Sequence, residues 1–402
     1  MLSSRLPRDL APNPIGRAIA RLRSQGADLV DLTESNPTRV GIAAPEGLLL
    51  GTAAIEPRVY EPRPLGLPAA RRAVAEHVSR AGRVVPPERV VLTAGTSEAY
   101  GHLFKLLCDP GDEVLSPRPS YPLFEHLTRL EGVRAVPYAL ECHARWELDL
   151  DSLQRGVSRR TRAVLLVSPN NPTGSYLTQT ELDAVEALCA AHDLALIVDE
   201  VFAPYPLAPG AAGPSVLDGD RDVLVFCLGG LSKAVGLPQL KLGWIAAAGP
   251  RPAVDRALAG LELICDTYLS VATPVQLAAG RLLAEGAEIT ARIAERVRGN
   301  HAALQRLEER HPAARVLPTE GGWYAVVQIP ATRSEEEVVL DLLESERVLV
   351  HPGYFYDFSR EAFLVVSLLP EPRRFGRGGG AGRGRRGPRA RASTGAPQNR
   401  PA

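Results

Sequence analysis

Residues 163–199 read AVLLVSPNNPTGSYLTQTELDAVEALCAAHDLALIVD and are the clearest indication of the fold. Its two ends, 163–168 and 195–199, are almost continuously apolar, and the segment 180–192 between them has a helical pattern. Strands that are apolar at every position are buried on both faces, which is typical of parallel sheets covered by helices. This stretch therefore predicts a strand–helix–strand unit.

The same alternation extends outward in both directions. We predict further strands at 90–93, 113–116, 223–228 and 242–247, and further helices at 69–82, 98–107 and 123–131. Alternating strands and helices predict an α/β protein. We expect a large domain over residues 46–275, with a mainly parallel sheet between helices.

The pattern changes near residue 276. Polar helices over 278–309 are followed by strands at 324–329 and 348–351, which predicts a smaller α+β domain over residues 276–375. Residues 1–45 are expected to form an N-terminal arm that joins the small domain and holds one helix near 15–25.

The last 27 residues, 376–402, contain eight Gly and seven Arg and no aliphatic side chain larger than Ala. They cannot bury apolar surface, so we predict a disordered tail. Two interpretations stay open: an RNA-contacting tail, although aromatic residues for base stacking are absent, or a gene read out of frame that replaces a closing helix.

The composition of the 402 residues is ordinary for a globular protein, with 45% apolar and 23% charged residues. No run is long enough for a membrane helix, and the N-terminus has no apolar core like that of a signal peptide. The five cysteines are scattered without a CxxC pair, which indicates reduced thiols in a cytoplasmic protein and no metal site. Without the tail, 39 basic residues face 46 acidic ones, so nucleic acid is not an expected partner.

Only three of the 46 basic residues are lysines: Lys105, Lys233 and Lys241. In a chain that uses Arg for charge, a lysine can be present for its amine, because Arg cannot form an imine. Two of the three lie in the segment 229–244, GGLSKAVGLPQLKLGW, which is the strongest local signal. Lys105 is expected on the polar face of a helix.

The segment 93–99, TAGTSEA, lies at a predicted strand-to-helix junction. Small residues there leave backbone N–H groups free at the positive end of a helix, which favours binding of a phosphate. The alternative is an ordinary helix start capped by Thr96 or Ser97. Taken alone, this segment favours the helix start.

The segment 168–174, SPNNPTG, follows a buried strand. Asn, Pro and Gly are turn residues, so a tight turn is one interpretation. The other places a ligand-binding loop at the carboxyl edge of a parallel sheet, where ligands bind. Asp199 ends the next strand, either as a solvated terminus or as a partly buried carboxylate that needs a cation.

Taken in order, these motifs resemble the class I/II aminotransferases, which are pyridoxal-phosphate enzymes with the aspartate-aminotransferase-like fold (fold type I). The resemblance covers roughly residues 30–370. Asn171, Asp199, Lys233 and Lys241 follow one another at intervals of 28, 34 and 8 residues, which fit that family. The phrases YEPRPLGLPAAR, PRPSYPLF and GGWYAVV also match its usual patterns.

The resemblance implies a role for each motif. Lys233 would form the Schiff base with the cofactor aldehyde and then move a proton, and Asp199 would keep the pyridine nitrogen protonated. Asn171 would donate to the phenolic oxygen of the ring, and Tyr121 would stack on its face. The implied phosphate ligands are Gly95, Thr96, Ser97, Ser232, Lys241 and, from the neighbouring subunit of a homodimer, Tyr60.

The sequence also departs from the family pattern around the cofactor. Lys241 stands where the family usually has a bidentate Arg, and Gly230 stands where a phosphate-binding Ser is frequent. Phe202 replaces a Tyr whose phenol would bind the cofactor, so Asn171 would make that contact alone.

The largest departure is on the last strand, where the family commonly places the Arg that grips the substrate carboxylate. Val365 occupies that position. Arg39, in the segment 35–39 (SNPTR), is our candidate for the missing grip, with a surface charge as the alternative, and Asn36 and Asn171 are further candidate substrate ligands.

The implied function is transfer of an amino group from an L-amino acid to a 2-oxo acid. Other pyridoxal-phosphate reactions, namely C–S β-elimination, decarboxylation or racemisation, remain alternatives because of Val365, and so does a non-catalytic, cofactor-binding regulator. For His351 a structural turn is favoured over a catalytic role. Trp323 and Tyr324 are expected either in the substrate pocket or in the core.

Overall fold

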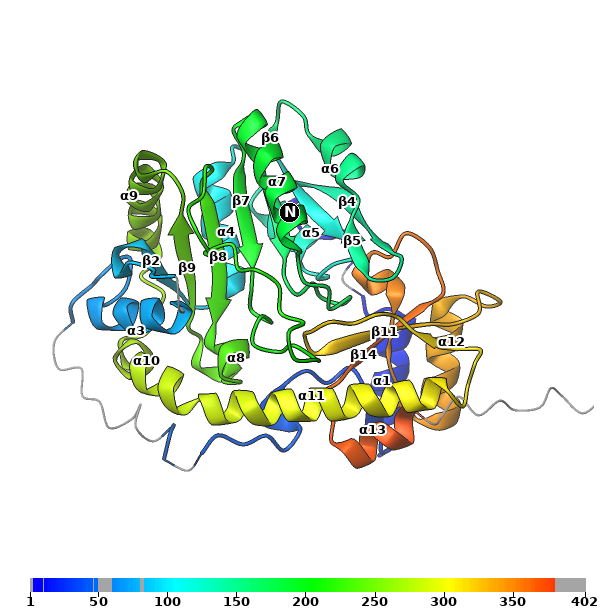
Figure 1. Cartoon of the computed structure of the whole chain (residues 1–402). Helices are drawn as coiled ribbons and strands as arrows, with labels where there is room; N and C mark the ends of the chain where they lie inside the picture. The colour runs from blue at the N-terminus through cyan, green and yellow to red at the C-terminus, as the bar shows by residue number, and fades with distance from the viewer. Residues whose placement is uncertain (1–2, 10, 46, 50–59, 80–82, 380–402) are drawn as a thin grey trace, which may run out of the picture.

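The computed structural model describes residues 3–9, 11–45, 47–49, 60–79 and 83–379. At its centre lies an eight-stranded sheet with the order β2-β9-β8-β7-β6-β3-β4-β5 (Figure 1). Its strands are β2 (Val90–Thr93), β3 (Glu113–Arg118), β4 (Arg134–Cys142), β5 (Trp146–Leu148), β6 (Thr161–Val167), β7 (Ala195–Asp199), β8 (Val225–Gly230) and β9 (Gly243–Ala248). The neighbours from β8 to β4 pair in parallel, whereas β9 is antiparallel to β2 and β8, and β5 to β4. The predicted mainly parallel sheet is thus confirmed.

Side-chain alternation explains why the strands are apolar throughout. Along β6, Val164 and Leu166 belong to one buried cluster, and Ala163 and Leu165 belong to another on the opposite face. Successive side chains of a strand point to opposite faces, so a strand covered on both sides needs apolar residues at every position.

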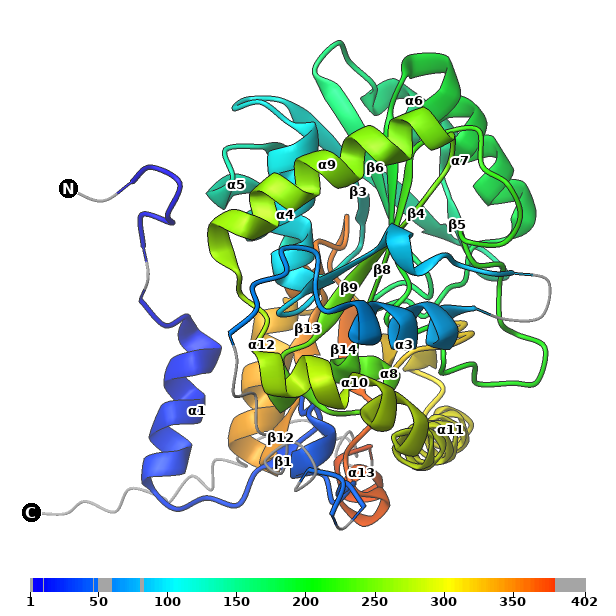
Figure 2. The ribbon, with the colours of Figure 1, turned by 90° about the vertical axis from the view of Figure 1, so that its left-hand side faces the viewer.

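Helices cover both faces of this sheet (Figure 2). The cluster on one face includes residues of α4 (Thr96–Leu107), α5 (Phe124–Leu130) and α9 (Arg251–Tyr268). The cluster on the other includes residues of α6 (Leu150–Gly156) and α7 (Gln179–His192). α3 (Pro68–Val78) packs against α10 (Thr273–Glu285).

A second, antiparallel sheet has the order β10-β11-β14-β13. Its strands are β10 (Arg315–Val316), β11 (Tyr324–Gln328), β13 (His351–Pro352) and β14 (Phe363–Ser367). The long helix α11 (Ala287–Glu308) runs past both sheets (Figure 1). α1 (Pro14–Ser24) contacts α12 (Glu335–Asp341), and β1 (Val30–Asp31) pairs in parallel with β12 (Val348–Leu349), so the N-terminal segment is joined to this part of the chain.

Shorter elements connect these parts. Two of them are the helices α8 (Leu231–Ala234) and α13 (Pro372–Gly379). The others are the 3₁₀ helices η1 (Pro37–Arg39), η2 (Pro87–Arg89), η3 (Pro238–Leu240) and η5 (Gly353–Tyr356), and the π-helical turn η4 (Leu342–Glu346).

The prediction of a disordered tail from residue 376 is wrong for its first residues. Residues 376–379 belong to α13, which contacts α11, and Phe375 in the same helix is fully buried. Burial of this large apolar side chain stabilises the docking of the short helix, which begins at Pro372. Residues 380–402 lie outside the described residues.

The sequence analysis did not predict helices α9 and α6 or strand β4.

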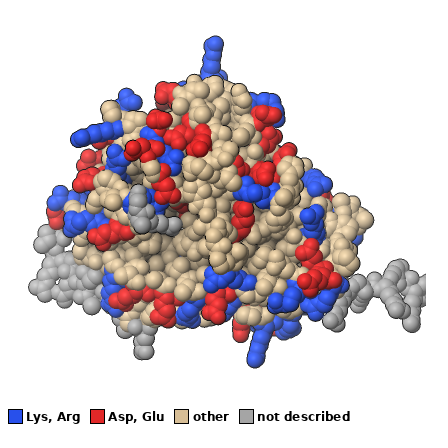
Figure 3. Space-filling model, viewed as in Figure 1, with Lys and Arg blue, Asp and Glu red and all other residues tan. Residues whose placement is uncertain are grey.

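Acidic and basic side chains are intermingled on the face of the molecule in Figure 3. Among the described residues, no helix is both long enough and apolar enough to cross a membrane.

Candidate active site

Six strands bring their carboxyl ends to one edge of the large sheet. β3, β4, β6, β7 and β8 are parallel, and β2 runs in the same direction because both it and β8 are antiparallel to β9. A cavity of about 420 Å³ lies at this edge. Loops that follow parallel strands meet at such an edge, so residues far apart in the sequence share one site.

Nine of the ten predicted cofactor ligands line this cavity. They are Gly95, Thr96, Ser97, Tyr121, Asn171, Asp199, Ser232, Lys233 and Lys241. Each lies at or after the end of a strand or, for Lys241, precedes the start of β9.

Asp199, the last residue of β7, is a buried carboxylate. Tyr100 Oη donates to its Oδ2 at 2.8 Å, and the Val201 N–H donates to its Oδ1 at 3.0 Å. Burial raises the pKa of Asp199, while these two hydrogen bonds and the charge of Lys233 oppose the rise. A buried carboxylate of this kind is suited to pair with a cationic N–H group.

Lys233 lies in the short helix α8, directly after β8. The Tyr205 hydroxyl donates to its backbone carbonyl, and its Nζ lies 5.3 Å from the centre of the Trp323 ring. Burial lowers the pKa of Lys233, the charge of Asp199 raises it, and the charge of Lys241 lowers it further. A lowered pKa favours the neutral amine, which is the nucleophilic form.

The start of α4 forms the third part of the site. Gly95 precedes the helix, and no side chain caps it, so its first N–H groups are available to a ligand. Lys241 Nζ lies 3.8 Å from the position that a Cβ on Gly95 would take. Free N–H groups at the positive end of a helix, next to an ammonium group, favour an anion such as a phosphate.

Glycines allow the strands to approach each other at this point. A Cβ on Gly243 would lie 2.8 Å from the Gly95 Cα, and a Cβ on Gly230 would lie 3.2 Å from the Gly243 Cα. Close packing against Gly243 therefore explains why residue 230 is a glycine. The predicted phosphate motif, in which a Ser is frequent at this position, did not indicate this.

The two adjacent asparagines have different surroundings. Asn170 Nδ2 donates to the Pro119 carbonyl at 3.2 Å and to Thr173 Oγ1 at 2.9 Å, so this residue holds the turn. Asn171 lines the cavity, and the Oδ1 atoms of both asparagines are buried with no hydrogen-bond partner among the described residues. The turn interpretation fits Asn170, and Asn171 is the one of the two that borders the cavity.

Asp199 and its neighbour Glu200 also have different surroundings. The Ser215 hydroxyl and the Val216 N–H both donate to the Glu200 carboxylate at 2.7 Å, which fixes the loop that contains them. Glu200 is therefore structural.

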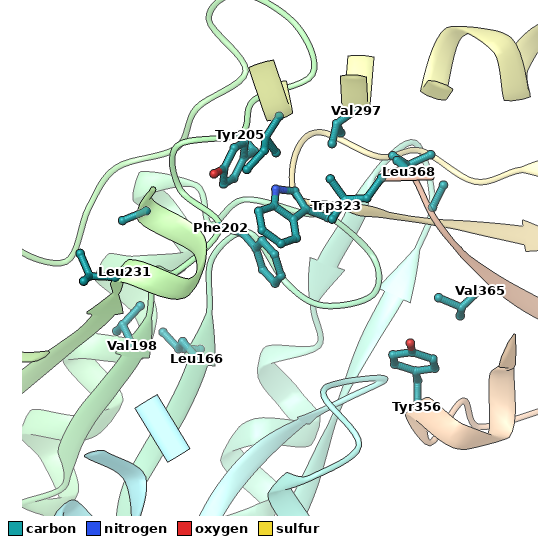
Figure 4. Packing of buried hydrophobic residues seen from close by; sticks show 14 of the residues in the cluster. Leu166, Val198, Phe202, Tyr205, Leu231, Val297, Trp323, Tyr356, Val365 and Leu368 are labelled. Carbon is teal, nitrogen blue, oxygen red and sulfur yellow. The ribbon is translucent and has the colours of Figure 1, made fainter. Parts of the chain in front are cut away.

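One wall of the cavity is uncharged. Ser35, Phe202 and Tyr324 line it, while Trp323 is fully buried behind Phe202, with ring centres 5.3 Å apart (Figure 4). Of the two aromatic candidates, Tyr324 thus belongs to the pocket and Trp323 to the core. Val365 is buried in β14, near Tyr356 in Figure 4.

Other predicted residues lie away from this cavity. Tyr60 is 75% exposed and lines a separate depression, which also includes Cys265 of α9. Asn36 caps η1 by accepting from the Thr38 N–H at 3.0 Å. Arg39 is exposed, with its Nη1 3.6 Å from Glu34 Oε2, and lines a third depression.

Two further residues considered in the sequence analysis, Lys105 and His351, contact other side chains of the protein. Lys105 pairs with Glu131 on the surface at 2.6 Å, as expected. His351 Nδ1 lies 3.0 Å from Tyr356 Oη, and burial lowers the pKa of His351.

Sequence reasoning missed Tyr100, Ser35 and Glu98 as cavity residues. Tyr100 comes one turn after the start of α4, on the side that faces the end of β7, so its helical spacing from Thr96 is the signal that could have found it. Ser35 has no comparable signal, because a loop serine is too common.

The donor set fits pyridoxal phosphate. An anion site at the start of α4, a buried carboxylate, a lysine with a lowered pKa and the amide group of Asn171 match its phosphate, ring nitrogen, aldehyde and phenolic oxygen in type.

Comparisons with known proteins agree with this chemistry. The family model described as "Aminotransferase class I and II" matches residues 32–371. The chain is 27% identical over 364 residues to the glutamate-pyruvate aminotransferase AlaA of Escherichia coli (strain K12), covering 88% of this chain and 90% of that protein. It is 29% identical over 375 residues to an alanine aminotransferase of Mycobacterium tuberculosis (strain ATCC 25618 / H37Rv), covering 89% and 85%.

Solved structures show the same fold. An aminotransferase from Escherichia coli superposes with a TM-score of 0.85 at 25% identity, covering 95% of this chain and 96% of that one. An alanine aminotransferase from Pyrococcus furiosus superposes with a TM-score of 0.87 at 24% identity, covering 95% and 98%.

Proposed function

Because the chain belongs to the class I and II aminotransferase family, we propose that the cavity at the edge of its large sheet is where the amino group is transferred. The protein is a pyridoxal-phosphate-dependent aminotransferase with an aspartate-aminotransferase-like fold. The observation that supports this place for the site is the meeting of Asp199, Lys233 and Lys241 in one cavity.

When bound, the cofactor supplies an aldehyde for the amine and a ring that withdraws electrons from the carbon being deprotonated. Lys233 provides the amine that holds it, and Asp199 holds a proton at the ring nitrogen. Tyr100 keeps the Asp199 carboxylate oriented through its 2.8 Å hydrogen bond. The start of α4, Lys241 and Ser232 bind the phosphate.

Lys233 also moves the proton. Once a substrate amine has displaced it, its Nζ accepts the proton that leaves the amine-bearing carbon. Burial lowers the pKa of Lys233, so the free amine is available for this step at a lower pH than in an exposed lysine. Tyr121 and Asn171 hold the ring in place from the cavity wall.

We propose an L-amino acid, with alanine or glutamate as the first donors to test, and a 2-oxo acid as the acceptor. The printed names of two relatives, glutamate-pyruvate aminotransferase and alanine aminotransferase, support this choice.

We further propose a cytoplasmic homodimer. Tyr60 is exposed in the single chain, which suits a residue that reaches the phosphate in a partner subunit. All five cysteines are free, which suits a reducing compartment. The division into an arm (1–45), a large domain (46–275) and a small domain (276–375) is also retained as a proposal.

The test is an absorption spectrum of the holoenzyme before and after L-alanine or L-glutamate, followed by a 2-oxo acid. We expect the donor to change the cofactor band and the oxo acid to restore it. Borohydride reduction and peptide mapping should place the cofactor on Lys233. Labelling at Lys105, or release of ammonia and pyruvate instead of a reversible change, would contradict the proposal.

A further inference from the structure

The uncharged wall of the cavity raises the question of how a substrate carboxylate is bound. Among the described residues that line the cavity, the basic side chains are Lys233 and Lys241, and none is an arginine. Under the proposed function Lys233 holds the reacting amine, and Lys241 lies beside Gly95 at the anion site. A carboxylate that enters needs other donors, because a buried charge without hydrogen bonds is costly.

Strands β14 and β13, which follow β11 in the second sheet, supply no cation either. Val365 in β14 is paired with Val326 of β11 and with His351 of β13, and it is buried. The pKa of His351 is lowered by burial, so its imidazole is neutral at pH 7. Its Nδ1 is engaged with Tyr356.

Two hydroxyl groups of the wall are available as donors. Tyr324 and Ser35 both line the cavity. Burial raises the pKa of Tyr324 to about 12 although the Ser35 hydroxyl lowers it, so the Tyr324 phenol keeps its proton and can donate at neutral pH.

Phe202 lies close both to the Tyr324 ring and to the reacting amine of Lys233. Lys233 Nζ lies 5.9 Å from the centre of the Phe202 ring, and the Tyr324 ring lies 6.2 Å from the same ring, perpendicular to it. Phe202 therefore lies near both the amine and the Tyr324 ring, and all three residues line the cavity that a substrate with adjacent amine and carboxylate groups would enter.

We propose that Tyr324 and Ser35 bind the substrate carboxylate through neutral hydroxyl donors, in place of a guanidinium group. The proposal rests on the proposed function. Two hydroxyls bind a carboxylate less strongly than a bidentate arginine does, so the KM for amino acids is high and depends little on ionic strength.

The test compares L-alanine with ethylamine, which has the same amine but no carboxylate, in half-reactions of the holoenzyme. In Tyr324→Phe we expect the KM for L-alanine to rise about 10- to 100-fold, the range for loss of a hydrogen bond to a charged group, with little change in kcat. The reaction with ethylamine should be unchanged. Ser35→Ala should show the same pattern with a smaller rise in the KM for L-alanine. This variant provides the test if Tyr324→Phe does not fold.

Tyr354→Phe is the matched control, because the Tyr354 hydroxyl bonds to Glu336 outside the cavity. Equal losses with L-alanine and ethylamine would overturn the proposal, and so would a wild-type enzyme that uses ethylamine as well as L-alanine. Failure of the proposed function looks different: no donor changes the cofactor band, and borohydride does not fix the cofactor to Lys233.

Discussion

The two sides of the cavity differ in the chemical character of their side chains. The side at the edge of the large sheet carries charges, Asp199, Lys233 and Lys241, each fixed by a strand end. The uncharged wall, from Tyr324 of β11, Ser35 of the N-terminal segment and Phe202 after β7, carries phenol, hydroxyl and phenyl groups. We infer that the charged side fixes the cofactor and the reaction type, whereas the neutral wall sets which substrate enters.

The largest expected effect is on the charged side. Lys233→Ala removes both the amine that holds the cofactor and the group that moves the proton, so transfer should fall by at least about 10⁴-fold. The measurement is the rate of the half-reaction with L-alanine. Lys105→Ala, which removes a surface lysine paired with Glu131, should leave that rate unchanged.

Asp199→Asn keeps the shape of the side chain and removes its charge. We expect transfer to fall by about 10²- to 10³-fold, the range for loss of one electrostatic stabiliser in an active site. Asp193→Asn is the matched control, because Asp193 is exposed and has a left-handed backbone that Asn tolerates. Full activity of Asp199→Asn would show that the charged side does not carry the chemistry.

Lys241→Gln should weaken cofactor binding about 10- to 100-fold, because a charged hydrogen bond to the phosphate is lost. It should also raise the pKa of Lys233, since the charge of Lys241 lowers that pKa, whereas Asp199→Asn should lower it. The pH dependence of acylation of Lys233 in the apoprotein measures both shifts. Shifts of the same sign in the two variants would contradict this account, and Lys105→Gln is the control.

The same contrast explains what the sequence revealed. That Lys233, Asp199 and Asn171 lie in one cavity could be predicted because lysines are rare in this chain and because strand ends lie in recognisable order. The parallel sheet could be predicted because its strands are apolar at every position. Ser35 and Tyr100 could not, because their types are common and only the packing of distant segments brings them to the cavity. Arg39 is the opposite case. The sequence suggested it as a ligand of the substrate carboxylate, but its guanidinium group pairs with Glu34.

The smallest expected effect lies where the two sides meet. Phe202 lines the cavity within 5.9 Å of Lys233 Nζ and contacts Tyr324 on the neutral wall. Phe202→Tyr adds one hydroxyl, and a net hydrogen bond of about 0.5–1.5 kcal/mol should tighten cofactor binding a few-fold. Cofactor titration of the apoprotein measures this.

The KM for L-alanine discriminates between two positions for that new hydroxyl. An unchanged KM with tighter cofactor binding places Phe202 on the charged side, as a cofactor neighbour. A lower KM with unchanged cofactor binding places it on the neutral wall, beside Tyr324. Because one added oxygen can serve only the side that it faces, this substitution locates the boundary between cofactor binding and substrate selection.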